Sequence, residues 1–246
     1  MESIRAALPG DYARLARIAA EGDSEDCDAH YLSFVADSGR LLCSIVNDEV
    51  VAFAGTVPVD GVAMVTDRFV AKTSRGYGIG GQLLRELLQQ HPRRMTFSAR
   101  NVGALSSYRR MGMQPRGRML YLSGSGLAGR SSGPPLQPSA WVHGRSDLVG
   151  HYSARGAIVT SNAVALVSAG GVDVLRLEAS DAIAACDLLL RAFDSGTNVR
   201  LYVPEQHRLA GWLLANSFAV VDHDVLCATD GADLPPALAA LHPGLA

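Results

Sequence analysis

The chain has 246 residues, of which 48% are hydrophobic and 19% are charged, and its formal net charge is -2 at pH 7. This composition excludes an intrinsically disordered chain, and the length fits either one large domain or two of about 120 residues. Since no apolar run reaches the roughly 18 residues of a membrane helix and the N-terminal residues lack a signal-peptide pattern, we expect a cytoplasmic protein that contacts no membrane.

The first half of the chain alternates strand and helix patterns. Apolar, β-branched runs between turn residues predict strands, and apolar residues at helical spacing predict helices. In chain order, the predicted elements are a strand at 3–8, a helix from Asp11, strands at 41–46, 50–57 and 62–71, a helix from Ile79, a strand at 95–99 and a helix at 102–111 that Gly112 caps.

The most informative motif is the run Arg75-Gly76-Tyr77-Gly78-Ile79-Gly80-Gly81, which lies between a predicted strand and an amphipathic helix. Glycines accept positive φ and let the backbone approach a ligand closely. The first amides of the helix face an anion with the helix dipole behind them, and Arg75 adds a positive charge. The run therefore predicts a cradle for phosphate.

Two other phosphate-binding motifs share part of this pattern. Gly76-x-Gly78-x-x-Gly81 satisfies the dinucleotide fingerprint, but it does not open the first strand–helix unit. The acidic residue that this fingerprint needs about 20 residues later is also missing. A Walker A loop requires Gly-Lys-Ser/Thr, whereas Lys72 is the only lysine in the chain. Both alternatives are disfavoured.

The arrangement resembles the GNAT superfamily of acyl-CoA-dependent N-acyltransferases, whose pyrophosphate loop follows Arg/Gln-x-x-Gly-x-Gly/Ala. Arg75, Gly78 and Gly80 fit that loop, and residues 66–70 resemble the family's fourth strand. The family usually carries Asn, Ala, Tyr and Gly-Phe downstream, where this chain has Asn101, Ala104, Tyr108 and Gly112-Met113. The resemblance covers about residues 3–122 and implies an acyl-CoA, such as acetyl-CoA, as co-substrate and a small-molecule amine as acceptor.

The resemblance also implies the site residues. The glycine-rich run would hold the pyrophosphate, and the backbone before it would hold the pantetheine arm. Tyr108 is the predicted general acid, because a phenol beside the sulfur can protonate the departing thiolate, although a tyrosine at helical spacing can also be a plain core residue. The predicted cofactor-binding residues are Phe69, Val70, Ala71, Arg75, Gly76, Tyr77, Gly78, Ile79, Gly80, Gly81, Asn101 and Tyr108.

The general base has several candidates. Asp67 lies on the strand that leads to the glycine-rich run, where burial would raise its pKa enough to accept a proton from an ammonium, or where it anchors the strand end. An acidic loop precedes it, which either attracts a cationic amine or is simply solvated. The acidic residues of that loop are Glu21, Asp23, Glu25, Asp26 and Asp28. His30 is predicted to be a surface or hydrogen-bonded histidine rather than a base.

Residues 92–146 contain nine arginines and no Asp or Glu. They form a solvated face, contact the phosphates of CoA, or contact a nucleic-acid backbone. The last reading motivates an alternative, a transferase of the same fold whose donor is an acyl-carrier protein or an aminoacyl-tRNA. A third hypothesis is a non-catalytic sensor that binds CoA or another small ligand.

Cys27, Cys43, Cys186 and Cys227 are far apart, with no CxxC pair and no histidine at metal-ligand spacing. We therefore predict ordinary thiols and no metal site. Abundant arginine, alanine and glycine with one lysine indicate a GC-rich bacterial genome. The sequence identifies neither the acceptor nor the oligomeric state, and a homodimer remains open.

Breaker-rich residues after position 122 predict a linker. The predicted domains are therefore 1–123 and 141–246, joined by a linker at 124–140, and we expect an α/β fold with a mixed sheet flanked by helices in each. The second half repeats the order of elements, with strands at 157–160, 163–168 and 172–177, a helix at 181–193, a strand at 199–203, a helix at 205–215 and a strand at 218–227.

The second half lacks the cofactor motif. In place of the glycine-rich run it has Glu178-Ala179-Ser180, whose acid would repel phosphate. It resembles the degenerate C-terminal domains of tandem GNAT proteins, which keep the fold without binding CoA and help to wall the acceptor site. Asp147, His151 and Tyr152 are candidates for that wall, although each is also typical of a surface residue.

Overall fold

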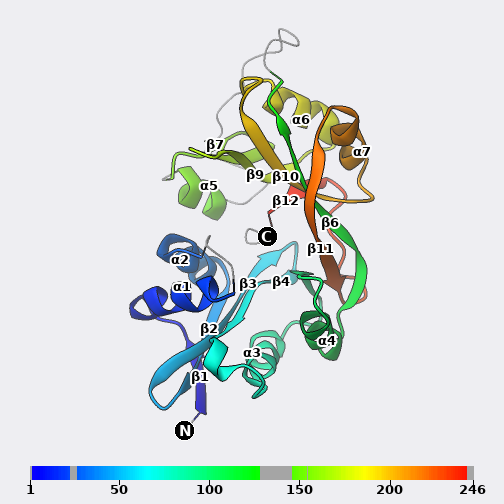
Figure 1. Ribbon diagram of the computed structural model, residues 1–246. Coiled ribbons are helices and arrows are strands. Elements are labelled where there is room, and N and C mark those ends of the chain that lie inside the picture. Colours follow the sequence, from blue (N-terminus) through cyan, green and yellow to red (C-terminus); the bar gives the residue numbers. More distant parts are fainter. Residues whose placement is uncertain (1, 23–26, 128–145, 154, 243–246) are drawn as a thin grey trace. The chain divides into compact units, whose positions relative to one another are not determined.

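The structure is a computed structural model that describes residues 2–22, 27–127, 146–153 and 155–242 (Figure 1). The chain divides into two compact units, the first made of residues 1–115 and 227–233 and the second of residues 116–226 and 234–245. Each unit contains parallel and antiparallel strand pairs together with helices, which confirms the predicted mixed α/β class.

The first unit contains a mixed sheet in the order β1-β2-β3-β4-β5, in which only the pair β4–β5 is parallel. Figure 1 shows α1 and α2 on one side of these strands and α3 and α4 on the other. The strands are β1 (Glu2–Ala6), β2 (Arg40–Val46), β3 (Glu49–Val59), β4 (Val62–Val70) and β5 (Arg94–Ser98). The helices are α1 (Tyr12–Ala20), α2 (Ala29–Ser38), α3 (Ile79–Leu88) and α4 (Val102–Arg110), with short 3-10 turns η1 (Pro9–Asp11) and η2 (Lys72–Ser74).

The helix α3 forms because its leucines recur at helical spacing and face the sheet. Leu83, Leu84 and Leu87 are fully buried, and each such side chain contributes about 1.5–3 kcal/mol relative to exposure. The glycine-rich run that begins this helix is therefore attached to a firmly packed element.

The strand β4 has an open edge along its second half. Its pairing with β5 covers only Ala63–Val65, whereas its pairing with β3 continues to Val70. Opposite β3, Gly55 pairs with Asp67 and Thr56 pairs with Val65, so Thr66 is the extra residue of a β-bulge. Backbone groups on the β5 side of residues 66–70 are consequently available to a ligand.

The second unit contains a sheet in the order β11-β6-β10-β9-β8-β7, with β12 paired to β9. Apolar residues of β6, β9, β10, α6 and α7 form its core. The strands are β6 (Gln114–Ser125), β7 (Ile158–Val159), β8 (Ala163–Ser168), β9 (Gly171–Glu178), β10 (Asn198–Pro204), β11 (Ala219–Ala228) and β12 (Leu238–Leu241). The helices are α5 (Ser146–Ser153), α6 (Ala182–Leu190) and α7 (Arg208–Ala215).

The element assignments of the sequence analysis differ from the structure at four places. The helix α2 was not predicted, nor were α5 and β12. The strand β6 runs through Ser125, so Gly124 and Ser125 belong to a strand and not to the predicted linker, and β6 joins the second unit from Arg116. Residues 128–140 of the predicted linker lie outside the described residues. Strand pairing with β10 explains how this glycine- and serine-rich stretch stays extended.

Candidate functional site

A cavity of about 860 Å³ lies in the first unit, beside the open edge of β4 and the start of α3. It brings together two segments that the sequence analysis assigned to one site, the strand–turn–helix region and α4. The predicted site residues that line it are Asp67, Phe69, Val70, Arg75, Gly76, Gly78, Ile79, Gly80, Gly81, Asn101 and Tyr108.

The glycine-rich run has a backbone conformation that favours glycine. Gly76 has a φ of +89° and Gly78 a φ of +82°, and a Cβ at either position would meet open space rather than protein. Gly78 is the N-cap of α3, so the amides of Ile79 and Gly80 belong to its first turn, where the helix supplies no partner for them. The turn therefore offers a concave, positively polarised surface that fits a phosphate group.

The guanidinium of Arg75 is fixed at this turn. Its Nε donates to the carbonyl oxygen of Val70 at 2.9 Å and its Nη2 donates to the carbonyl oxygen of Glu21 at 3.4 Å. Both partners are neutral, so the positive charge stays uncompensated by these two bonds. An anion at the mouth of the cavity would be attracted to it.

The described acidic residues of the acidic loop accept hydrogen bonds from backbone amides. Glu21 accepts a hydrogen bond from the amide of Lys72 at 2.7 Å, and Asp28 caps α2 by accepting from the amide of Tyr31 at 2.8 Å. Asp23, Glu25 and Asp26 lie outside the described residues. His30 is exposed.

Asp67 is buried and hydrogen-bonded to a residue that the sequence analysis missed. The hydroxyl of Tyr31 on α2 donates to Oδ2 of Asp67 at 2.5 Å, and Asp67 is 8% exposed. Burial raises the pKa of Asp67 above its ordinary value, while the Tyr31 hydrogen bond acts in the opposite direction. Burial and the neighbouring carboxylate also raise the pKa of Tyr31. This carboxylate has the raised pKa expected of a general base.

Tyr108 lies on α4 and lines the cavity, with 6% of its surface exposed. The guanidinium carbon of Arg68 lies 5.2 Å from the centroid of its ring, a cation–π contact. Asn101 is the N-cap of the same helix, and its Oδ1 accepts from the amide of Ala104 at 2.8 Å. Asn101 therefore positions α4 with its carbonyl oxygen, and its amide nitrogen is the part left for a ligand.

Two predicted cofactor-binding residues do not belong to the described lining of the cavity. Ala71 is 2% exposed, and its amide already donates to the carbonyl oxygen of Val51 at 2.8 Å, so this amide is not available to the cofactor. Tyr77 is 79% exposed at the tip of the turn. The amide of Val70 points to the opposite side from that of Ala71, toward the open edge of β4, because successive amides alternate along a strand.

The residues suggested for the acceptor wall lie in the second unit. Asp147, His151 and Tyr152 all belong to α5. The expectation that Tyr152 is a surface residue is wrong, because it is 2% exposed and packs edge-on against His151 at 4.7 Å between ring centroids. The four cysteines are buried, and none of them forms a disulfide.

The sequence analysis assigned no role to Tyr31, which is hydrogen-bonded to Asp67, or to Arg68, which lines the cavity. Asp28 before an apolar pattern at Tyr31, Leu32 and Val35 is a helix-start signal that would have found α2. Nothing in the pattern links Tyr31 to Asp67, since the two are 36 residues apart.

In the described part of the chain, no helix is long and apolar enough to cross a membrane. The described residues also contain no group of three or more His, Cys, Asp or Glu side chains that could hold a metal ion.

Residues 7–113 match the model of the acetyltransferase (GNAT) family. No curated protein matches the sequence. Among solved structures, a candidate acetyltransferase from Pyrococcus horikoshii has 16% identity and a TM-score of 0.77, over 100% of this chain and 96% of that chain.

Two further structures extend over both units. A GCN5-related N-acetyltransferase from Sphaerobacter thermophilus has 17% identity and a TM-score of 0.56, over 93% of this chain and 95% of that one. A GCN5-related N-acetyltransferase from Kribbella flavida has the same identity and TM-score, over 93% of this chain and 71% of that one. At these identities the likeness establishes the fold alone. The match to the acetyltransferase (GNAT) family model covers residues 7–113, which are less than half of the chain.

Proposed function

We propose that the first unit transfers an acetyl or related acyl group from acyl-CoA to the amine of a small-molecule acceptor, with both substrates bound at once. One observation carries this proposal. The positive-φ glycine turn at the start of α3 lies in the same cavity as a buried carboxylate, Asp67, and a buried phenol, Tyr108. A phosphate-binding surface, a base and an acid are the parts that this reaction needs.

The donor would be held along β4 and the turn. Arg75 and the amides of residues 78–80 would bind the pyrophosphate, and the open edge of β4 would bind the pantetheine arm through backbone hydrogen bonds. The amide of Val70 would donate to the carbonyl oxygen of the acyl group. Preorganised donors of this kind stabilise the oxyanion that forms during attack.

The chemistry would then follow from the side chains. The carboxylate of Asp67 takes a proton from the acceptor's ammonium, and the neutral amine attacks the thioester carbon to form a C–N bond and an oxyanion. When the carbonyl re-forms, the C–S bond breaks and its electron pair leaves with sulfur. Tyr108 donates a hydrogen bond or a proton to that thiolate. Holding two reactants together supplies most of the remaining acceleration.

The donor site is tested by acetyl-CoA binding to a variant that adds charge without backbone strain. Gly81 lines the cavity, needs no positive φ, and a Cβ there would meet only Arg85 Nη1 at 3.9 Å. We expect Gly81→Glu to weaken acetyl-CoA binding by about tenfold or more, because its carboxylate repels the pyrophosphate. Calorimetry measures the affinity, and a thermal unfolding scan confirms the fold.

Gly81→Ala is the matched control, since it adds the Cβ without the charge, and we expect it to bind acetyl-CoA nearly as tightly as the wild type. Failure of the folded wild type to bind acetyl-CoA would contradict the proposal. Equal affinities of the two variants for acetyl-CoA would mean that the pyrophosphate does not bind at the turn. Once binding is established, a screen of amines with acetyl-CoA identifies the acceptor.

The hydrogen bond from Tyr31 predicts a change in pH dependence. This bond stabilises the ionised form of Asp67 and so lowers the pKa of that carboxyl. In Tyr31→Phe the pKa of Asp67 rises further, and the acidic limb of kcat/KM should move to higher pH by about one unit. The pH–rate profile with one fixed acceptor measures the shift.

Tyr12→Phe is the control for this shift, because Tyr12 is a tyrosine of α1 outside the described lining of the cavity. We expect its acidic limb to coincide with that of the wild type. A Tyr31→Phe profile that superimposes on the wild type would mean that Asp67 is not the group whose ionisation limits the rate.

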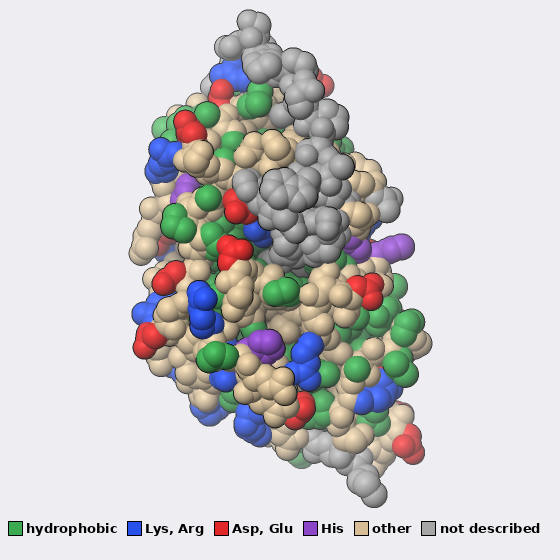
Figure 2. All heavy atoms as spheres, turned by 180° about the vertical axis from the view of Figure 1, so that it is seen from behind, with side chains coloured by type: hydrophobic (Ala, Val, Ile, Leu, Met, Phe, Trp, Pro, Cys, Tyr) green, Lys and Arg blue, Asp and Glu red, His purple; other side chains and the backbone are tan. Residues whose placement is uncertain are grey.

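The alternative donors and the sensor hypothesis are outcomes of the same experiments. On the face drawn in Figure 2, basic and acidic side chains are interspersed, so that face offers no broad cationic surface of the kind that a tRNA backbone needs. If the protein does not bind CoA but shifts the electrophoretic mobility of aminoacyl-tRNA in a salt-dependent way, the aminoacyl-tRNA donor is favoured. CoA binding without turnover of any amine would favour a sensor.

A further inference from the structure

Arg68 is a cationic side chain in the reaction cavity that the proposed function has not used. It follows Asp67 on β4 and points to the other face of the sheet, since its contacts are with α3 and α4 and those of Asp67 are with α2. Its Nη1 lies 3.5 Å from where a Cβ on Gly80 would be, and its guanidinium carbon lies 5.2 Å from the Tyr108 ring centroid. The guanidinium thus lies between the phosphate turn and the proposed acid.

The charge of Arg68 has only weak protein partners in the described residues. Its Nη1 donates to Ser107 Oγ at 3.3 Å, and that oxygen also accepts from Arg110 Nη2 at 3.3 Å while donating to the carbonyl oxygen of Gly103. Its Nε is buried and has no hydrogen-bond partner there. Within the described part of the chain Arg68 forms no ion pair with a carboxylate. A half-buried guanidinium in this state favours an anion that is not part of the resting protein.

We propose that Arg68 stabilises the thiolate of CoA as it leaves. This inference rests on the proposed function, because Tyr108 marks the position of the sulfur. As the C–S bond breaks, its electron pair moves to sulfur, and the guanidinium keeps its own proton while its charge lowers the energy of the thiolate. Arg68 would therefore be a catalytic residue for the second half of the reaction.

Ordinary acidities explain why a second group is needed. Phenols in water have a pKa of about 10 and thiols one of about 8.5, so a phenol alone does not transfer its proton completely to a thiolate. A neighbouring cation removes this difficulty, because the thiolate then departs as an anion with a hydrogen bond from the phenol. Arg68 and Tyr108, in contact with each other, supply both interactions to one sulfur.

The test measures the pKa of the CoA thiol while CoA is bound. An opposite charge within about 4–6 Å typically lowers a pKa by about one to three units, so we expect the bound thiol in the wild type to ionise at lower pH than free CoA. In Arg68→Leu its pKa should rise by about one to two units, and in Arg68→Lys it should stay near the wild-type value. The ultraviolet absorbance of the thiolate follows the titration, and desulfo-CoA in a parallel titration removes the contribution of tyrosine.

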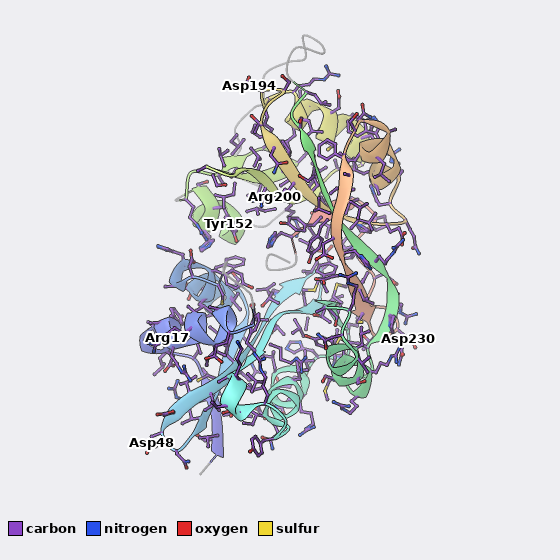
Figure 3. The ribbon with its side chains drawn as sticks, viewed as in Figure 1. Arg17, Asp48, Tyr152, Asp194, Arg200 and Asp230 are labelled. Carbon is purple, nitrogen blue, oxygen red and sulfur yellow. The ribbon has the colours of Figure 1, made fainter. Side chains whose placement is uncertain are left out.

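The control is Arg17→Leu. Arg17 is an exposed arginine on α1, labelled in Figure 3, and is outside the described lining of the cavity. Its loss should leave the thiol pKa unchanged. Calorimetry with CoA confirms that each variant binds, and thermal unfolding confirms that each is folded.

The results separate this inference from the proposed function. If the folded wild type does not bind CoA, both are overturned. If all variants bind CoA and the thiol pKa is the same in the wild type and in Arg68→Leu, only the role of Arg68 is overturned. The thiol pKa could also stay unchanged while Arg68→Leu weakens the binding of succinyl-CoA much more than the binding of acetyl-CoA. In that case Arg68 recognises a carboxylate on the acyl chain instead.

Discussion

Tyr108→Phe is expected to lower kcat by about 10²- to 10³-fold while leaving the affinity for acetyl-CoA near that of the wild type. The substitution removes only the hydroxyl, so the buried ring and its contact with Arg68 remain. The loss should fall in the lower part of the range for general acids, because Arg68 would still stabilise the thiolate. Steady-state kinetics with the identified acceptor, together with calorimetry, measure both quantities.

Combining Tyr108→Phe with Arg68→Leu makes the result more specific. If both side chains stabilise the same thiolate, the double variant should lose less activity than the product of the two single losses, because the effects of groups that act together are not additive. An unchanged kcat in Tyr108→Phe would contradict the assignment of Tyr108 as the acid. The Tm of each variant must stay close to that of the wild type for the kinetics to be interpreted.

Asp67→Asn is expected to lower kcat/KM by about 10²- to 10⁴-fold and to abolish the acidic limb of its pH profile. The amide cannot accept the proton of an ammonium, but its oxygen can still accept the hydrogen bond from Tyr31. The loss therefore reports the missing base and not a disrupted contact. Wild-type activity in this variant would assign the base to another group, with the acidic loop as the next place to search.

Stability should change in the opposite direction to activity. Burial raises the pKa of Asp67 above its ordinary 3.8, so the folded state favours the protonated form. The wild type then loses stability as the pH rises from about 3.8 through the raised pKa of Asp67 in the folded state. Asp67→Asn carries no such charge. The Tm of this variant minus the Tm of the wild type should therefore increase as the pH rises through that window. At neutral pH the Tm of the variant should equal or exceed that of the wild type. Thermal scans across the window measure this difference.

The sequence predicted the parts of the site that depend on local geometry. The positive φ of Gly76 and Gly78 and the start of α3 follow from glycines before a helical pattern, and the end of α4 follows from Gly112, which has a φ of +80°. These features need only neighbouring residues, so their pattern is visible in the chain.

The features that depend on tertiary pairing were not predictable in the same way. The use of the Ala71 amide follows from the register between β3 and β4, and the pairing of Tyr31 with Asp67 follows from the packing of α2 on the sheet. Arg68 stood inside the recognised strand, but the role proposed for it depends on how α4 approaches β4. Gly124 and Ser125 were misread because glycine and serine also typify linkers, and only pairing with β10 makes them part of a strand.

The bulge at Thr66 fixes which face each of the next residues occupies, and Asp67 and Arg68 are consecutive. In the proposed reaction, the separation between the carboxylate that would start it and the guanidinium that would end it is therefore limited by a single peptide unit and two side chains. If the proposed function holds, sequence changes in the segments around β4 could alter the acceptor that is used, while these two adjacent residues keep the reactive groups at a fixed spacing along the chain.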